Sequence, residues 1–382
     1  MPEAHAITAV QSMPDSLTVV WDDGQSARFP ALWLRDCRPE DRDPHSGQRL
    51  VDVTDLPEEP RIRTARAAHG GLDLQFEGEP SACHYGADWL REHAATTADR
   101  RPELRTRLWP NGSERDARRD HAWLDYARFS ATAADRLQWL TRLAQDGIAF
   151  LSGVPARERA ILEACAKMGR VAETNYGLLF EVRSVAQPEN LAFSDHGLGL
   201  HTDNPYREPV PGFQALHVLV SSPDGGENLF ADGIAIAEEL RTTEPGAFST
   251  LTSTPVPFHY RSVDADLYAE RPLIQLSADG RIVAVHYNNR SIAPLSPVGA
   301  DLGAFYAAYR RFARLLREPR FQMRRHLGDG ELVVFDNQRT LHGRTAFSSQ
   351  RHPRHLQGCY LTRDSVYSEI GLLRRGAGGN GT

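Results

Sequence analysis

Short apolar runs separated by clusters of turn-forming residues constrain the fold of this chain most. Residues 214–220 and 282–287 are strand-like runs, and residues 223–226 combine Pro, Asp and two Gly between such runs. Runs of this length are typical of strands, because amphipathic helices usually extend over ten or more residues. One amphipathic helix, at about residues 302–316, precedes the last strand, residues 331–336. We therefore expect a mainly β (α+β) protein built as a sandwich or jelly roll.

The length of 382 residues favours two domains rather than one. Alternating apolar residues on both sides of Asp23-Gly24 predict a hairpin, and the opening stretch reads as a small, mainly β domain over residues 1–98. Residues 99–130 are rich in arginine with interleaved acidic residues, and we interpret them as a solvated linker. A second domain over residues 131–382 begins with a helix that ends at Gly147.

Composition excludes several classes of partner. The formal net charge is only -6, so no bulk field attracts nucleic acid or an anionic membrane. The N-terminus lacks the features of a signal peptide, and no apolar run approaches the roughly 20 residues of a membrane span. We expect a cytoplasmic protein that acts on small molecules. The four cysteines, Cys37, Cys83, Cys165 and Cys359, show no Cys-x-x-Cys pair and are expected to be reduced thiols.

A metal site is indicated by two separate sequence segments. His201-Thr202-Asp203 places an imidazole and a carboxylate two residues apart, and on an extended chain that spacing directs both to one face. His342, far along the chain, supplies a third candidate ligand. Two histidines and one carboxylate form the facial triad of oxygen-activating non-haem iron(II), which leaves positions for a cosubstrate and dioxygen. Taken alone, His-x-Asp could instead have a structural role, because chance pairs of this kind are expected in a chain with 15 histidines.

An arginine after the distal histidine suits a dicarboxylate cosubstrate. Arg351 and Arg354 precede residues 357–360, and a guanidinium can hold a carboxylate with two parallel hydrogen bonds. We favour Arg354 as the clamp for 2-oxoglutarate. The alternative is that both arginines lie on the surface of a terminal strand.

Residues 201–209 together with residues 341–344 resemble the γ-butyrobetaine dioxygenase group of 2-oxoglutarate oxygenases, and residues 33–36 resemble the N-terminal signature of that group. The resemblance covers nearly the whole chain. It implies a double-stranded β-helix catalytic domain, a homodimer, and the use of iron(II), 2-oxoglutarate and O2, often supported by ascorbate. It also implies that Asn228 and Leu216 line the cosubstrate pocket.

The same resemblance implies a substrate with a quaternary trimethylammonium group, which aromatic ring faces can bind without a hydrogen-bond donor. The matching cage positions are Tyr176, Phe180, Phe193 and Tyr360, each of which could alternatively be ordinary core. Amide side chains would hold the substrate anion. Candidates for the other substrate contacts are Asn190, Asn204, Asn288, Asn289 and Arg290.

One departure from the resemblance concerns zinc. The family often carries a Cys-rich zinc site just after Trp-Leu-Arg-Asp, whereas here Cys37 is followed by residues 38–45 without another cysteine. Cys37, His45, Cys83 and His84 could in principle form a different site, but we do not predict zinc.

These features lead to one favoured function and two alternatives. We expect hydroxylation of γ-butyrobetaine to L-carnitine, or of 2-(trimethylammonio)ethylphosphonate at the carbon beside phosphorus. Arg290 favours the phosphonate because that group can carry a second negative charge, while the overall resemblance favours the betaine. Trimethyllysine is disfavoured, because no second amino-acid recognition site is evident. The alternatives are a taurine-type sulfonate dioxygenase and a non-catalytic scaffold that binds a ligand or protein.

Overall fold

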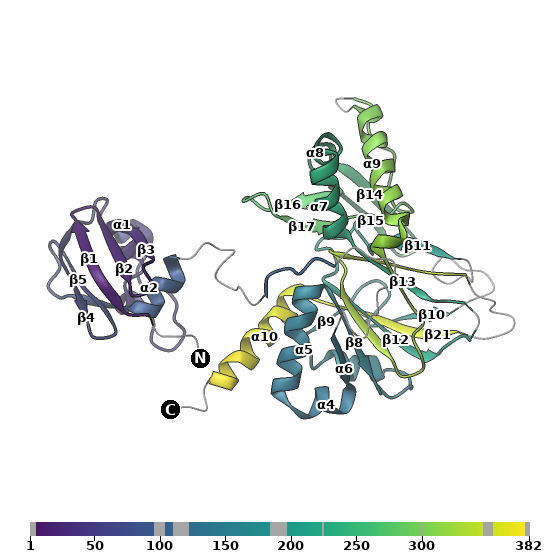
Figure 1. The fold of residues 1–382 in the computed structure, drawn as a ribbon, viewed down its shortest axis with the longest axis horizontal. Coiled ribbons are helices and arrows are strands. Elements are labelled where there is room, and N and C mark those ends of the chain that lie inside the picture. The colour runs from purple at the N-terminus through teal and green to yellow at the C-terminus, as the bar shows by residue number, and fades with distance from the viewer. Residues whose placement is uncertain are drawn as a thin grey trace. The chain divides into compact units, whose positions relative to one another are not determined.

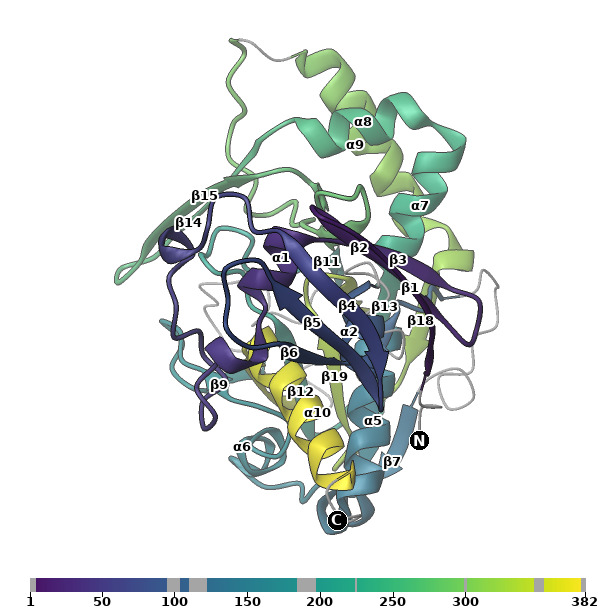
Figure 2. The ribbon, with the colours of Figure 1, turned by 90° about the vertical axis from the view of Figure 1, so that its left-hand side faces the viewer.

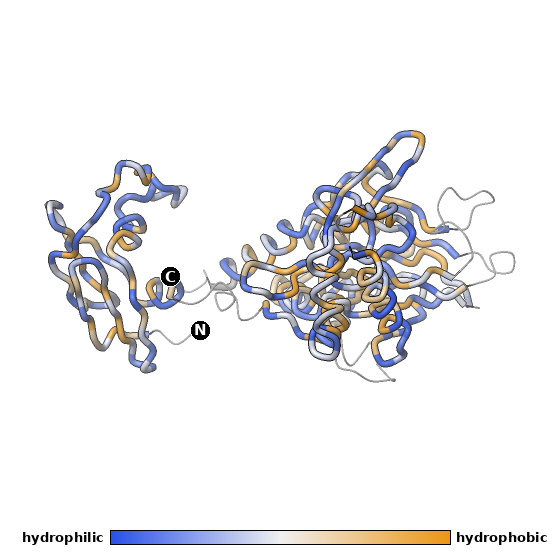
Figure 3. Tube along the Cα trace, turned by 90° about the horizontal axis from the view of Figure 1, so that it is seen from above, coloured by the Kyte–Doolittle hydropathy of each residue, from blue (hydrophilic) through white to orange (hydrophobic). Residues whose placement is uncertain are grey.

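The structure, a computed structural model, describes residues 5–94, 104–109, 122–183, 197–223, 225–298, 301–346 and 354–378. The chain divides into two compact units, Met1–Pro102 and Glu103–Thr382 (Figure 1). Hydrophobic and hydrophilic positions are interleaved along both units (Figure 3). Among the described residues, no helix is both long and apolar enough to cross a membrane.

The first unit contains two three-stranded antiparallel sheets, visible in Figure 2. The sheets share one apolar core, to which Leu17, Trp21, Leu72 and Tyr85 contribute. The predicted hairpin at Asp23-Gly24 joins two strands of the first sheet. The elements are β1 (Ile7–Met13), β2 (Ser16–Trp21), β3 (Ser26–Pro30), α1 (Ala31–Asp36), η1 (Pro39–Asp41), η2 (Val53–Asp55), β4 (Ile62–Ala68), β5 (Gly71–Phe76), β6 (Cys83–Gly86) and α2 (Ala87–Ala94).

The second unit is built on two sheets. The larger has the order β10-β21-β12-β19-β8-β7, with β9 pairing β21, and the smaller has the order β11-β20-β13-β18. Neighbouring strands are antiparallel except β7 and β8, which are parallel. The larger sheet contains β7 (Ala122–Asp125), β8 (Ile148–Ser152), β9 (Val171–Ala172), β10 (Phe180–Arg183), β12 (Phe213–Val220), β19 (Leu332–Asp336) and β21 (His355–Leu361). The smaller contains β11 (Leu198–His201), β13 (Asn228–Asp232), β18 (Gln322–Arg325) and β20 (Thr340–Arg344).

The two sheets of this unit face each other across a shared apolar core. Phe150 and Val333 of the larger sheet pack in one cluster with Phe230 and Met323 of the smaller sheet. The outer face of the larger sheet is covered by α5 (Ala133–Asp146), α6 (Ala160–Cys165) and α10 (Arg363–Gly378). Strands with both faces buried read as continuous apolar runs. This explains why residues 214–220 could be recognised as a strand from the sequence.

A helical layer covers the outer face of the smaller sheet. Its core joins Leu200 and Leu341 of that sheet with apolar residues of the helices. The layer contains α7 (Gly233–Thr243), α8 (Pro245–Ser253), β14 (Val256–Arg261), β15 (Asp266–Arg271), β16 (Ile274–Leu276), β17 (Ile282–Val285), α9 (Leu302–Arg317) and η5 (Pro319–Phe321). The amphipathic segment expected near residues 302–316 is α9.

Residues 99–130 were expected to form a linker, but the second half of this stretch contains regular secondary structure. It contains β7 and most of α4 (Tyr126–Ala131). β7 extends the larger sheet beside β8, and the Trp123 ring stacks on Phe150 with centroids 4.7 Å apart. This stretch is rich in arginine, and β7 has only a few apolar residues because it is a short edge strand. The sequence pattern therefore did not indicate a strand here.

Candidate active site

Two antiparallel strands bring the candidate metal ligands together. His201, the last residue of β11, lies directly opposite His342 of β20 in the strand register. Asp203 follows β11, and its backbone is held by Asn337: the Asp203 N–H donates to Asn337 Oδ1 (2.7 Å), and Asn337 Nδ2 donates to the Asp203 carbonyl (3.0 Å). This amide pair holds the chain after β11, so that Asp203 faces the two imidazoles.

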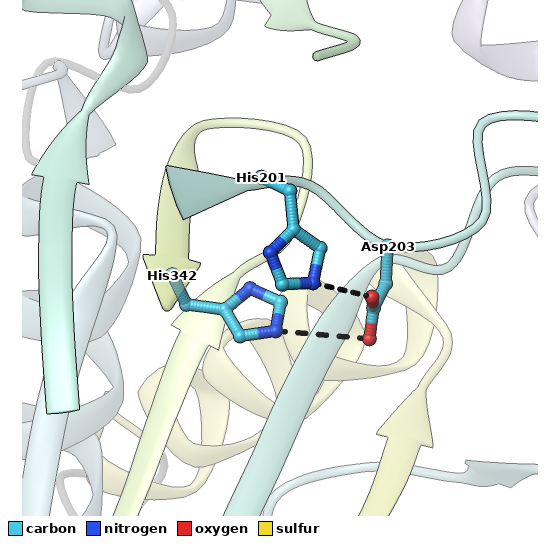
Figure 4. Close-up of side chains that lie close together, drawn as sticks. All are labelled: His201, Asp203 and His342. Carbon is cyan, nitrogen blue, oxygen red and sulfur yellow. Dashed lines mark ion pairs between the residues drawn. The ribbon is translucent and has the colours of Figure 1, made fainter. Parts of the chain in front are cut away.

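Figure 4 shows the three side chains converging. Nε2 of His201 lies 3.2 Å from Oδ1 of Asp203, and Nε2 of His342 lies 3.8 Å from Oδ2. One donor atom from each residue lies within 4.8 Å of the other two. This spacing suits three ligands of one ion.

The protonation of these groups also suits a metal. His201 Nδ1 lies 2.9 Å from the Gly199 carbonyl, so it carries the proton and leaves the Nε2 lone pair facing Asp203. Burial and the neighbouring His201 lower the pKa of His342 to about 3, which keeps that imidazole neutral. Burial alone would raise the pKa of Asp203, but His342, His201 and Tyr360 outweigh it and the pKa is lowered. Two imidazoles and one carboxylate fit iron(II).

A cavity next to these ligands gathers most of the other candidate residues. It lies between the two sheets of the second unit, and β10, β12, β13 and β21 contribute to its lining. The candidates that line it beside the three metal ligands are Tyr176, Phe180, Asn204, Leu216, Asn228, Arg290, Arg354 and Tyr360. The Phe180 and Tyr360 rings lie against each other with centroids 5.2 Å apart. Gly358, opposite Phe180 in the strand register, leaves room for that ring, since a Cβ there would lie 2.4 Å from it.

Beside Arg290 and Arg354 the cavity is lined by Arg344, which was not among the site residues expected from the sequence. Arg354 is buried, and its Nη2 donates to Asn228 Oδ1 (3.3 Å). Burial and the neighbouring Arg344 lower the pKa of Arg354 to about 10. Arg344 is buried and lines the same cavity. Because Arg344 is two residues after His342 on β20, the strand period could have identified it.

Gln214 was missed as well. It lies two residues before Leu216 on β12 and lines the cavity. Its Oε1 is buried without a hydrogen-bond partner in the described part of the chain.

The residues expected to bind the substrate anion lie in different places in the structure. Arg290 lines the cavity, and no hydrogen bond or ion pair joins its guanidinium to another described residue. Asn288 is buried and donates to the Thr202 carbonyl (3.0 Å), so it holds the chain between the metal ligands and does not line the cavity. Asn289 accepts a hydrogen bond from Tyr309 (2.9 Å) and lines a neighbouring cavity against α9. Asn190 and Phe193 lie outside the described residues.

The first unit places the residues considered for zinc in different surroundings. The buried Cys83 thiol donates to the Leu74 carbonyl (3.3 Å), and His84 Nδ1 lies 2.8 Å from Asp73. Within residues 5–94, the candidate metal group is instead His5, Asp22 and Asp23, of which both aspartates are exposed. In the second unit, the Cys165 and Cys359 thiols are free and 3.6 Å apart.

Comparisons with known proteins agree with this geometry. The family model "Taurine catabolism dioxygenase TauD, TfdA family" matches residues 116–360, and "Gamma-butyrobetaine hydroxylase-like, N-terminal" matches residues 9–91. The chain is 34% identical to γ-butyrobetaine dioxygenase of Pseudomonas sp. (strain AK-1), over 98% of each chain. It is 25% identical to trimethyllysine dioxygenase of Meyerozyma guilliermondii, over 97% of each.

The fold has solved counterparts. A taurine dioxygenase from Burkholderia xenovorans superposes with a TM-score of 0.50 at 16% identity, covering 67% of this chain and 90% of that one. The chain therefore belongs to the γ-butyrobetaine dioxygenase-like family of iron(II)- and 2-oxoglutarate-dependent oxygenases, and it is a dioxygenase.

Proposed function

We propose that the protein hydroxylates a small zwitterion with a trimethylammonium group at one end and an anion at the other. The observation that carries the proposal is one cavity in which the three metal ligands, a buried arginine and aromatic rings meet. γ-Butyrobetaine, giving L-carnitine, is the first candidate, supported by the likeness to the Pseudomonas enzyme over nearly the whole chain.

The cation end of the substrate would lie against Tyr176, Phe180 and Tyr360. A trimethylammonium group has no N–H donor, so aromatic ring faces can bind it without a hydrogen bond. Carboxylates would be less selective, because they also attract other cations. Arg354, with Asn228 beside it, would hold 2-oxoglutarate through a charge-assisted contact.

The anion end of the substrate would be bound by Arg290. This guanidinium lines the cavity together with Asp203 and forms no ion pair with another described residue. Burial lowers the pKa of Arg290, and the charge of Asp203 opposes that shift. A phosphonate can carry two negative charges, so Arg290 supports 2-(trimethylammonio)ethylphosphonate as the second candidate.

The trimethyllysine dioxygenases among the relatives act on a substrate with a further amino-acid group, for which the described cavity lining offers no separate site.

Bound iron(II), with 2-oxoglutarate and O2 as cosubstrates, would supply the oxidising chemistry that converts C–H to C–OH while 2-oxoglutarate becomes succinate and CO2. The chain itself would orient the substrate. Rings at one end and Arg290 at the other would direct one C–H bond toward the metal ligands, an effect of position rather than of acid-base chemistry.

The remaining expectations belong to the same proposal. They are a double-stranded β-helix formed by the two sheets of the second unit, a homodimeric assembly, stimulation by ascorbate and a cytoplasmic location.

The proposal is tested by succinate formation. Protein loaded anaerobically with iron(II) is given O2, 2-oxoglutarate and, in competition, γ-butyrobetaine, its phosphonate analogue and taurine. We expect preferential turnover of one trimethylammonium substrate, and which one is preferred identifies the anion. Preference for taurine would instead indicate a sulfonate dioxygenase, and absence of substrate-stimulated succinate would indicate a non-catalytic scaffold.

The variant Phe180→Ala examines the cation site. A desolvated cation–π contact contributes about 2 kcal/mol, so the KM of the trimethylammonium substrate should rise roughly 30-fold. The KM of the cosubstrate, measured in the same assays, should stay near its original value. An unchanged substrate KM would remove Phe180 from the site.

A further inference from the structure

A continuous chain of side-chain hydrogen bonds runs from Tyr206, which does not line the cavity, through two cavity residues to a metal ligand. Tyr206 Oη donates to Asn204 Oδ1 (2.6 Å), and Asn204 Nδ2 donates to Tyr360 Oη (3.2 Å). Tyr360 Oη in turn donates to Oδ2 of Asp203 (2.8 Å). Each group donates in the same direction, and the chain ends on the carboxylate.

The three groups that precede the carboxylate are buried. Tyr206, Asn204 and Tyr360 expose only 5%, 6% and 4% of their surface. Hydrogen bonds inside a protein resist competition from water, and a buried polar network restrains its members when every member is satisfied. Asn204 uses both its amide oxygen and its amide nitrogen in this network, which fixes its orientation.

The backbone at Asn204 is unusual as well. Its φ is 54°, in the left-handed region that residues other than glycine rarely adopt. Asparagine tolerates this region better than most residues, yet the conformation still has a cost that the surroundings must offset. This conformation places the amide between Tyr206 and Tyr360.

Tyr360 contacts both the metal ligand and the proposed cation site. Its ring lies against Phe180, while its hydroxyl group binds Oδ2 of Asp203. The other carboxylate oxygen, Oδ1, faces His201 Nε2 at 3.2 Å. Oδ2 also lies 3.8 Å from His342 Nε2, but only Oδ2 accepts the tyrosine hydrogen bond, so Oδ1 is the oxygen that the tyrosine leaves free.

We propose that Tyr360 and Asn204 are positioning residues for the metal site. Tyr360 restrains Asp203 so that it binds the metal through one oxygen only, and Asn204 acts through Tyr360 by holding its hydroxyl group. Outer hydrogen bonds of this kind orient metal-binding carboxylates and affect metal affinity. The further statement that Tyr360 also links substrate binding to the metal rests on the proposed function.

The principal test measures iron(II) affinity by anaerobic competition with a coloured chelator, without substrate. Tyr360→Phe keeps the ring and removes only the hydroxyl group. We expect the Kd of iron(II) to rise about 10- to 100-fold, the range found for lost outer contacts of metal sites. Tyr85→Phe, which removes a buried hydroxyl group hydrogen-bonded to the Leu34 carbonyl in the first unit, is the matched control. Its Kd should stay within about twofold.

Asn204→Gly tests the second residue. Glycine adopts positive φ without strain, so the variant removes the amide and leaves the backbone relaxed. We expect a smaller rise in the Kd of iron(II) than in Tyr360→Phe. Because Asn204 acts through Tyr360, the double variant should bind iron(II) about as weakly as Tyr360→Phe alone, whereas independent sites would show additive losses.

The outcomes separate this inference from the proposed function. An unchanged Kd in Tyr360→Phe, with a melting temperature like that of the parent, would overturn the positioning role. Additive losses in the double variant would overturn the action of Asn204 through Tyr360. If Tyr360→Phe raises the Kd of iron(II) but the parent protein turns over no trimethylammonium substrate, the positioning role of Tyr360 is supported and the proposed substrate is rejected.

Discussion

Arg344 and Arg354 place two guanidinium groups in one buried cavity. Two like charges repel each other at low dielectric, and the pKa of Arg354 is lowered to about 10 by burial and by Arg344. Both guanidinium groups line the cavity, so an anionic ligand that enters it can reach them. In the proposed function, one of the two carboxylates of 2-oxoglutarate would lie at the iron and the other at this pair.

The first prediction concerns Arg354. Arg354→Gln should raise the KM of the cosubstrate, 2-oxoglutarate, about 10- to 100-fold, because a hydrogen bond to a charged group contributes about 1.5–3 kcal/mol. Steady-state kinetics at saturating substrate measures the change. Arg290→Gln serves as the comparison and should raise the KM of the substrate while leaving the KM of the cosubstrate nearly unaltered. Equal effects of both variants on both constants would argue against separate roles.

Sequence patterns could identify some site residues and not others. His201 and Asp203 share a short motif, and Arg344 and Gln214 could have been found by counting two positions along a strand from an accepted site residue. Asn288 could not be placed in this way, because its amide binds the Thr202 carbonyl, a contact between distant segments. The orientation of an amide depends on such partners, which a sequence does not reveal.

The pairing of β11 with β20 sets the distance between the two histidine ligands. Gly343, beside His342, faces the β11 backbone closely: a Cβ at this position would lie 2.4 Å from the Leu198 carbonyl oxygen and 3.1 Å from Gly199 C. Backbone atoms cannot rotate away as a side chain can. A larger residue at this position must therefore separate the two strands.

The second prediction follows from that contact. Gly343→Ala should weaken iron(II) binding more than tenfold and lower the free energy of unfolding by about 1–3 kcal/mol, the usual cost of overpacking. Chelator competition and denaturant unfolding measure the two effects. Gly246→Ala on α8, where a Cβ meets no atom within 4 Å, is the control and should retain iron(II) affinity. Normal iron(II) binding by Gly343→Ala would show that the strands can part without disturbing the ligands.

Elements differed in how well the sequence indicated them. β12 and β19 are buried on both faces, so both are mostly apolar, with Gln214 and His217 as the polar interruptions of β12. β7 lies at the edge of the larger sheet as described, next to β8, and the arginine-rich composition around it indicated a linker. Strand order within a sheet depends on long-range pairing, which local patterns do not contain.

At the scale of the whole molecule, the two units have separate apolar cores. In the first unit an ion-pair cluster holds the segment after α1: Glu79 accepts hydrogen bonds from Arg35 and Arg38 (2.8 Å for Arg38), and Arg35 also binds Asp41. These charges are largely shielded from solvent. They lie beside Cys37, in the segment where we did not predict the zinc site that the family often carries.

The third prediction is that Glu79→Gln destabilises only the first unit. Removing the carboxylate leaves two partly buried guanidinium groups without their shared partner, which should cost about 1–3 kcal/mol. Hydrogen exchange should accelerate in peptides from residues 26–94, while peptides from residues 198–346 keep their protection and the iron(II) Kd stays constant. Faster exchange in both regions would show that the stability of the two units is coupled.

β20 occupies an inner position of the smaller sheet, between β11 and β13, although it is made long after both of them. During synthesis on a ribosome, β11 and β13 emerge while their common neighbour is still untranslated. His342 arrives with that strand, so a growing chain has only His201 and Asp203 available to a metal. Iron uptake must therefore follow translation of β20, and a prematurely terminated chain lacks a complete centre for reaction with oxygen.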